Sequence, residues 1–122
     1  MIIQIYAFTK LEQAIAAVNL GVDNVGFVAG LYDMVFGELS FEDARQMARS
    51  LPEGGTSTAI TMSDDVDEIL RMAEAVEPDI LHISSELEQV GLDKMAKIKK
   101  NLSPNIKLMK AIPVEDKYLH GW

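Results

Sequence analysis

The stretch Ile2-Ile3-Gln4-Ile5-Tyr6-Ala7-Phe8-Thr9 decides how this chain can fold. It is apolar and rich in β-branched residues, which predicts a buried strand. A helical pattern begins directly after it. Thr9 and Glu12 have the spacing of a capping box, in which both side chains satisfy free N–H groups of the first helical turn. Tyr6 lies near the carboxyl end of the predicted strand, where α/β proteins place their chemistry.

The same strand-and-helix unit recurs along the chain. The predicted strands are residues 2–9, 24–29, 57–62, 80–84 and 106–111. Between them, apolar stripes with helical spacing begin at Leu11, Phe41, Val66 and Leu92. Residues 30–39 are predicted to be a long loop with large apolar residues, either a lid over a site or a contact with another chain. Strict alternation of strands and helices predicts right-handed crossovers and a parallel sheet.

Short polar motifs mark the ends of the predicted helices. Ser40 with Asp43 resembles a capping signal for the second helix, and the cluster Ser63-Asp64-Asp65 opens the third. Gly21 supplies a left-handed stop after the first helix, and Pro78 stops the third. Asp64, Asp65 and Asp67 are therefore expected to be capping and helix-dipole residues, and no metal site is predicted from them.

Length and composition indicate one soluble domain covering residues 1–122, in which 48% of residues are apolar and 25% are charged. The net charge of −8 argues against nucleic acid and anionic membranes as partners. The absence of cysteine excludes disulfides, thiolate metal sites and a cysteine nucleophile. We see neither a signal peptide nor a run of about 18 apolar residues, and we expect a cytoplasmic protein without a cofactor.

Two architectures use this alternation, a doubly wound open sheet and a barrel. The residues that share each face of a strand distinguish these two architectures, although only weakly. Gln4 and Tyr6 share one strand face opposite Ile3 and Ile5, and His82 and Ser84 share one opposite Leu81 and Ile83. Polar side chains on one face near the carboxyl ends favour the mouth of a barrel, because a doubly wound sheet needs two apolar faces. No glycine-rich fingerprint follows the first strand, so a dinucleotide site is not predicted.

An ordered series of segments resembles the phosphoribosylanthranilate isomerase family. The matching segments are residues 5–14, 21–28, 40–44, 67–70, 78–84 and 106–112, in order and with matching spacing. The resemblance implies a (β/α)₈ TIM barrel, of which this chain would supply the first five strands and four helices. It also implies an Amadori-type rearrangement of phosphoribosylanthranilate, an intramolecular aldose-to-ketose isomerisation in tryptophan biosynthesis.

The chain departs from the family at the positions that carry this chemistry. The family's base is a cysteine of its first strand, and Tyr6 stands at the aligned position, followed by Ala7 in place of a glycine. Gly37 and Pro113 stand at or near positions where the family has arginines. The family's catalytic aspartate and phosphate site belong to strands six to eight, which lie beyond the five strands seen here. Whether the chain is an active enzyme is therefore left open.

The candidate site residues are carried by the strands that the resemblance aligns with the barrel mouth. Tyr6 and His82 are the candidate catalytic residues, with a lumen-filling aromatic and a hydrogen-bonded core histidine as the alternatives. Gln4, Ser84 and Lys110 are candidate substrate-binding residues. Ser84 has helix capping as an alternative role, and Lys110 has that of a solvated strand end.

Two hypotheses follow from these residues. The first is an isomerase-family enzyme that acts on a phosphosugar. The second is a non-catalytic half-barrel scaffold or small-molecule binding relative. Under either hypothesis five strands cannot close an eight-stranded barrel, because both edges would stay unpaired. We therefore expect a homo-oligomer or a missing C-terminal half.

Overall fold

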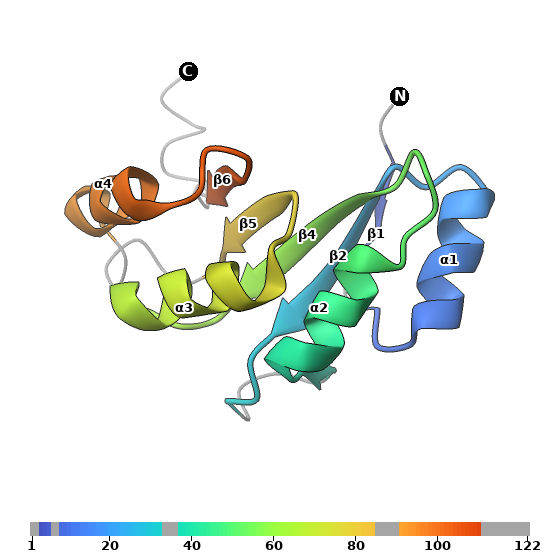
Figure 1. The fold of residues 1–122 in the computed structure, drawn as a ribbon, viewed down its shortest axis with the longest axis horizontal. Helices are drawn as coiled ribbons and strands as arrows, with labels where there is room; N and C mark the ends of the chain where they lie inside the picture. Colours follow the sequence, from blue (N-terminus) through green and yellow to red (C-terminus); the bar gives the residue numbers. More distant parts are fainter. Residues whose placement is uncertain (1–2, 6–7, 33–36, 85–90, 111–122) are drawn as a thin grey trace, which may run out of the picture.

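The computed structural model of the chain describes residues 3–5, 8–32, 37–84 and 91–110 (Figure 1). Strands and helices alternate from the N-terminus onward. In chain order they are β1 (Gln4–Ile5), α1 (Leu11–Asn19), β2 (Asn24–Ala29), β3 (Glu38–Leu39), α2 (Phe41–Arg49), β4 (Thr56–Thr61), α3 (Val66–Val76), β5 (Ile80–Ile83), α4 (Leu92–Asn101) and β6 (Lys107–Lys110). Every strand pair is parallel.

The strand order of the sheet is β1-β2-β4-β5-β6, which is also the order of these strands in the chain. A doubly wound sheet reverses its order at a switch point, and this path has no reversal. Because parallel crossovers are right-handed, an order without reversal puts all the helices on one face of the sheet. The predicted partial barrel is confirmed, and the doubly wound alternative is excluded.

The core lies between the sheet and the helices. Val25 and Phe27 of β2, Ala59 of β4, and Leu81 and Ile83 of β5 alternate along their strands and are fully buried. They form one cluster with side chains of all four helices: Ala14 and Ala17, Ala44 and Met47, Ile69, Met72, Ala73 and Val76, and Ile98. Each large apolar side chain buried in this way contributes about 1.5–3 kcal/mol.

The opposite face of the sheet carries the alternate residues. Val28 and Ile60 are buried there but lie outside the main core cluster. The register places Ile60 beside His82 and Thr58 beside Ile80. None of the four described helices packs on this face. In a closed barrel this face would line the lumen.

The capping box predicted at Thr9 and Glu12 is wrong. The residue before α1 is Lys10, and no side chain caps the helix. Thr9 lies one residue too early for the N-cap position. Its methyl group faces Gly37 instead, where an added Cβ would lie 3.0 Å from Thr9 Cγ2.

The predicted loop at residues 30–39 contains the short strand β3, which the sequence prediction missed. Val28 pairs with both Glu38 and Ile60, and a strand has only two edges, so β3 lies on the β1 side of β2. Leu39 is buried, and the Gly30 N–H donates to the Leu39 carbonyl at 2.7 Å. Residues 33–36 lie outside the described residues, so the lid and the chain-contact interpretations stay predictions.

The other predicted helix ends are confirmed. Ser40 Oγ accepts the Asp43 N–H at 3.1 Å. Asp65 Oδ1 accepts the N–H groups of Asp67 at 2.9 Å and Glu68 at 3.2 Å. Gly21 follows α1 with a φ of 105°. None of the described helices has the length and apolar character needed to cross a membrane.

We predict that Asp65→Ala lowers the free energy of unfolding by about 1 kcal/mol, because two N–H groups of α3 lose their acceptor. Urea denaturation monitored by circular dichroism measures this loss. Asp64→Ala is the matched control, since it removes the same charge one residue away, where the side chain is exposed and no cap is lost. Equal losses in the two variants would contradict the capping role.

Candidate functional site

Three of the predicted site residues lie at the carboxyl ends of β5 and β6, but on two faces of the sheet: His82 and Ser84 on the face without described helices, and Lys110 on the face of Ile83. Ile83 pairs with Lys110, and His82 pairs with Met109. The Ser84 N–H donates to the Thr61 carbonyl at 3.0 Å, which holds Ser84 at the end of β4. His82 is half-buried and Ser84 is exposed, and both have the parity of the sheet face without helices. Lys110 has the parity of Ile83 and ends the described part of β6.

The environment of His82 disfavours its charged form. Both ring nitrogens are buried. Burial lowers the pKa of the imidazole below its ordinary value, and the positive charge of Lys110 lowers it further. Burial also lowers the pKa of the Lys110 ammonium. At neutral pH, His82 is therefore an uncharged imidazole beside a lysine, a form that can accept a proton.

The first strand supplies the remaining predicted residues. β1 places the backbone of Gln4 opposite Asn24. The Gln4 side chain and Tyr6 lie outside what the structure describes, so their proposed roles stay predictions. Residues 111–122 are also outside it. No group of three or more His, Asp or Glu side chains that would hold a metal occurs among the described residues.

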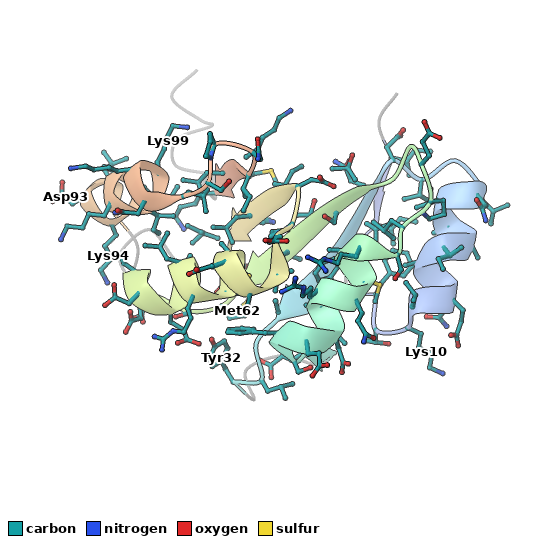
Figure 2. All side chains as sticks on the ribbon, viewed as in Figure 1. Lys10, Tyr32, Met62, Asp93, Lys94 and Lys99 are labelled. Carbon is teal, nitrogen blue, oxygen red and sulfur yellow. The ribbon has the colours of Figure 1, made fainter. Side chains whose placement is uncertain are left out.

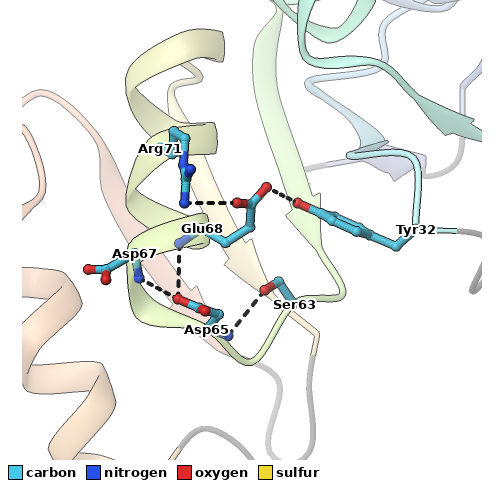
Figure 3. A network of polar contacts seen from close by, with 6 residues as sticks. All are labelled: Tyr32, Ser63, Asp65, Asp67, Glu68 and Arg71. Carbon is cyan, nitrogen blue, oxygen red and sulfur yellow. Dashed lines mark hydrogen bonds and ion pairs between the residues drawn. The ribbon is translucent and has the colours of Figure 1, made fainter.

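A polar network that the sequence analysis missed ties the chain after β2 to α3 (Figure 3). The Tyr32 hydroxyl donates to Glu68 Oε1 at 2.5 Å, and Glu68 Oε2 pairs with Arg71 Nη2 at 3.1 Å. Asp65 caps the same turn of α3. The network therefore links the second and third strand-and-helix units on the carboxyl side of the sheet. Only the i, i+3 spacing of Glu68 and Arg71 was visible in the sequence.

The backbone of Gly30 makes room for the Tyr32 ring. Gly30 has a φ of 114°, and a Cβ added there would lie 2.2 Å from Tyr32 Cε2. Any other residue would both strain the backbone and displace the ring. Burial raises the pKa of the Tyr32 phenol, and the hydrogen bond to the Glu68 carboxylate raises it further. The phenol therefore stays protonated and keeps donating at neutral pH.

No family model matches the chain. Its sequence is similar to the N-(5'-phosphoribosyl)anthranilate isomerase of Natronomonas pharaonis, with 29% identity over 84 residues. The match covers 69% of this chain and 40% of that protein.

The fold is similar to solved structures of the same enzyme. One is a phosphoribosylanthranilate isomerase in complex with reduced 1-(o-carboxyphenylamino)-1-deoxyribulose 5-phosphate, with a TM-score of 0.79, 24% identity, and coverage of 99% of this chain and 59% of that chain. The enzyme from Thermotoga maritima has a TM-score of 0.79, 24% identity, and coverage of 99% and 56%. The enzyme from Pyrococcus furiosus has a TM-score of 0.76, 17% identity, and coverage of 94% and 52%.

The strand order and these structural matches define the chain as part of a TIM-barrel-type α/β fold. The sequence match and the structural matches together support a relationship to the phosphoribosylanthranilate isomerases. The chain spans between two fifths and three fifths of the length of the relatives it matches.

We predict that His82 titrates below its ordinary pKa and that Lys110→Met raises this pKa, because the nearby positive charge is removed. Proton NMR of the histidine rings measures both values. Lys107→Met, at the exposed start of the same strand, is the control. His82 binds its proton more tightly in the unfolded chain than in the folded one. Its titration therefore leaves the free energy of unfolding unchanged above about pH 6.5 and lowers it as the pH drops toward the folded pKa. A His82 pKa unchanged by Lys110→Met would contradict the assigned cause.

We predict that Tyr32→Phe lowers the free energy of unfolding by about 1 kcal/mol, because Glu68 loses a hydrogen-bond donor. In tyrosine ¹³C NMR, the Tyr32 ring should titrate above the ordinary value of about 10, and Glu68→Gln should lower its pKa. The stabilisation is present below about pH 10 and is lost as the pH rises through the folded pKa. A Tyr32 ring that titrates at its ordinary pKa would contradict the network.

Proposed function

We propose that this chain supplies the first five strands of a phosphoribosylanthranilate isomerase-like barrel, which binds a phosphoribosyl substrate and isomerises it from aldose to ketose. The observation that carries the proposal is the parallel pairing of β5 with β6, which brings the carboxyl ends of the two strands side by side, with His82 and Ser84 on one face and Lys110 on the other. Barrel enzymes place their active sites at the carboxyl ends of the barrel strands. The relationship to the isomerases supports the substrate class and a role in tryptophan biosynthesis.

Four of the predicted site residues have a role in the proposed chemistry. The reaction needs a base that takes a proton from the sugar carbon and an acid that assists ring opening. The uncharged imidazole of His82 is the proposed base, and Tyr6 is the proposed second proton-transfer group. The exposed Ser84 hydroxyl and the Lys110 ammonium are suited to binding a phosphate or carboxylate of the substrate.

A second candidate function is a binding module without turnover. It is favoured by the tyrosine at position 6, where the family has its cysteine base. A phenol with an ordinary pKa of about 10 is a weak base at neutral pH. In this case the carboxyl ends of the strands still bind a phosphosugar, but His82 contacts the ligand and moves no proton.

The two edges of the described sheet need partners under either function. β1 and β6 each pair with one strand along the described path. A second copy of this chain, or further strands of a longer chain, would cover these edges and the face without helices. A cytoplasmic location stays part of the proposal, and the net charge of −8 supports a protein that binds neither nucleic acid nor an anionic membrane.

The test combines a turnover assay with calorimetry on the full chain. Phosphoribosylanthranilate is the substrate, and the reduced carboxyphenylamino-deoxyribulose phosphate bound by the structural neighbour is the binding probe. We predict that His82→Gln lowers the rate by about 100-fold with little loss of probe affinity, and that Lys110→Met weakens probe binding. Lys99→Met on α4 is the control and should change neither.

The outcomes separate the two candidates. Turnover that depends on His82 supports the isomerase. Probe binding that depends on Lys110, without turnover, supports the binding module and overturns the isomerase. If the probe does not bind to the wild-type chain, both functions are wrong.

A further inference from the structure

A groove of about 640 Å³ lies between α3 and the segment from α4 to β6, away from the carboxyl edge described above. It is lined by the C-terminal half of α3, the turn before β5 and the turn before β6: Leu70, Ala73, Glu74, Glu77, Pro78, Asp79, Asn101, Leu102, Ser103, Asn105 and Ile106. These residues lie at the amino ends of β5 and β6, so the groove is distinct from the proposed isomerase site. Its volume is within the range of small-molecule sites.

The floor of the groove is apolar. Leu70 of α3, and Leu102 and Ile106 after α4, lie at the margin of the core and keep part of their surface exposed. Ala73 is fully buried beneath them and leaves space above its small side chain. A ligand with a compact apolar body would cover this surface and exclude water from it.

The rim of the groove is acidic. Glu74, Glu77 and Asp79 contribute carboxylates, and none of the lining residues is a lysine, arginine or histidine. Asp79 Oδ2 already accepts hydrogen bonds from the N–H and hydroxyl of Ser57. Glu77 pairs with Arg49 of α2 at 3.1 Å. Glu74 is exposed and has no ion pair among the residues that the structure describes, so it is the carboxylate best placed to meet a cation.

Two lysines of α4, Lys94 and Lys99, are directed away from the groove. Lys94 Nζ donates to the Asp64 carbonyl just before the start of α3, at the other end of that helix from the groove. Lys99 projects from the side of α4 that faces away from α3 (Figure 2). Lys107 of β6 lines a neighbouring hollow of about 430 Å³, which shares Asp79 and Asn105 with the groove. The residues that line the groove itself therefore carry three carboxylates and no cationic side chain.

From this combination we propose that the groove binds a small organic cation, an ammonium or guanidinium group attached to a compact apolar body. The apolar body lies on Leu70, Leu102 and Ile106, and the cation faces Glu74. A neutral ligand of the same shape would gain the apolar contact alone, and an anion would be repelled by the rim.

The test is a ¹H–¹⁵N NMR titration of the full chain with three probes of one shape: phenethylammonium, 2-phenylethanol and phenylacetate. We expect phenethylammonium to bind tightest and to shift the amides of Leu70, Ala73, Leu102 and Ile106. Glu74→Gln should weaken its binding about two- to fivefold, the range expected for one exposed ion pair. Glu53→Gln, which removes an exposed carboxylate that does not line the groove, is the matched control and should have no effect.

Three results would overturn the proposal. One is equal binding of phenethylammonium and 2-phenylethanol, because charge would then play no part. The second is a loss of affinity in Glu53→Gln as large as that in Glu74→Gln. The third is a set of shifted amides outside α3 and the segment from α4 to β6. Far-UV circular dichroism of both variants verifies that each is folded.

Discussion

Burial of one sheet face by four helices is the constraint on which the rest of this structure depends. The strand order follows the chain without reversal, so every crossover returns on the same side and Phe27, Leu81 and Ile83 meet one continuous core. The same order aligns the carboxyl ends of the described strands at one end of the sheet and leaves the opposite face without any of the four described helices. The proposed site and the need for further pairing both follow from this one-sided packing.

The sequence predicted the parts of the fold that local pattern controls. The bounds of β2 are the predicted ones, and Ser40 and Asp65 cap their helices as expected, because period-two and helical spacing and short capping motifs are local signals. The strand predicted at residues 2–9 is too long, since residues 8 and 9 are not in a strand, and two further errors are of one kind. Thr9 and β3 are placed by contacts between distant segments, Thr9 with Gly37 and Glu38 with Val28, which no local pattern records.

The candidate site residues stay predictions, although the register of the sheet places their strand ends. The sequence put His82, Ser84 and Lys110 at the ends of strands, and the pairing of β5 with β6 brings these strand ends side by side. The depressed pKa of His82 depends on burial and on Lys110 of the next strand, and the Tyr32–Glu68 hydrogen bond joins residues of two units. Such effects arise from tertiary packing. The acidic groove has the same origin, since its floor and rim come from two helices and two turns.

The central claim is that this chain is a one-sided part of a barrel, in which the edge strands β1 and β6 have no further partner among the described strands of the path and no described helix covers the second sheet face. Its molar mass in solution, measured by light scattering coupled to size exclusion, tests this claim most directly. The account predicts that the 122-residue chain associates, because the edges of the described sheet and a face without described helices favour pairing with another copy. A stable, well-folded monomer would contradict the account, since the edges and the open face would then have to be covered within a single chain.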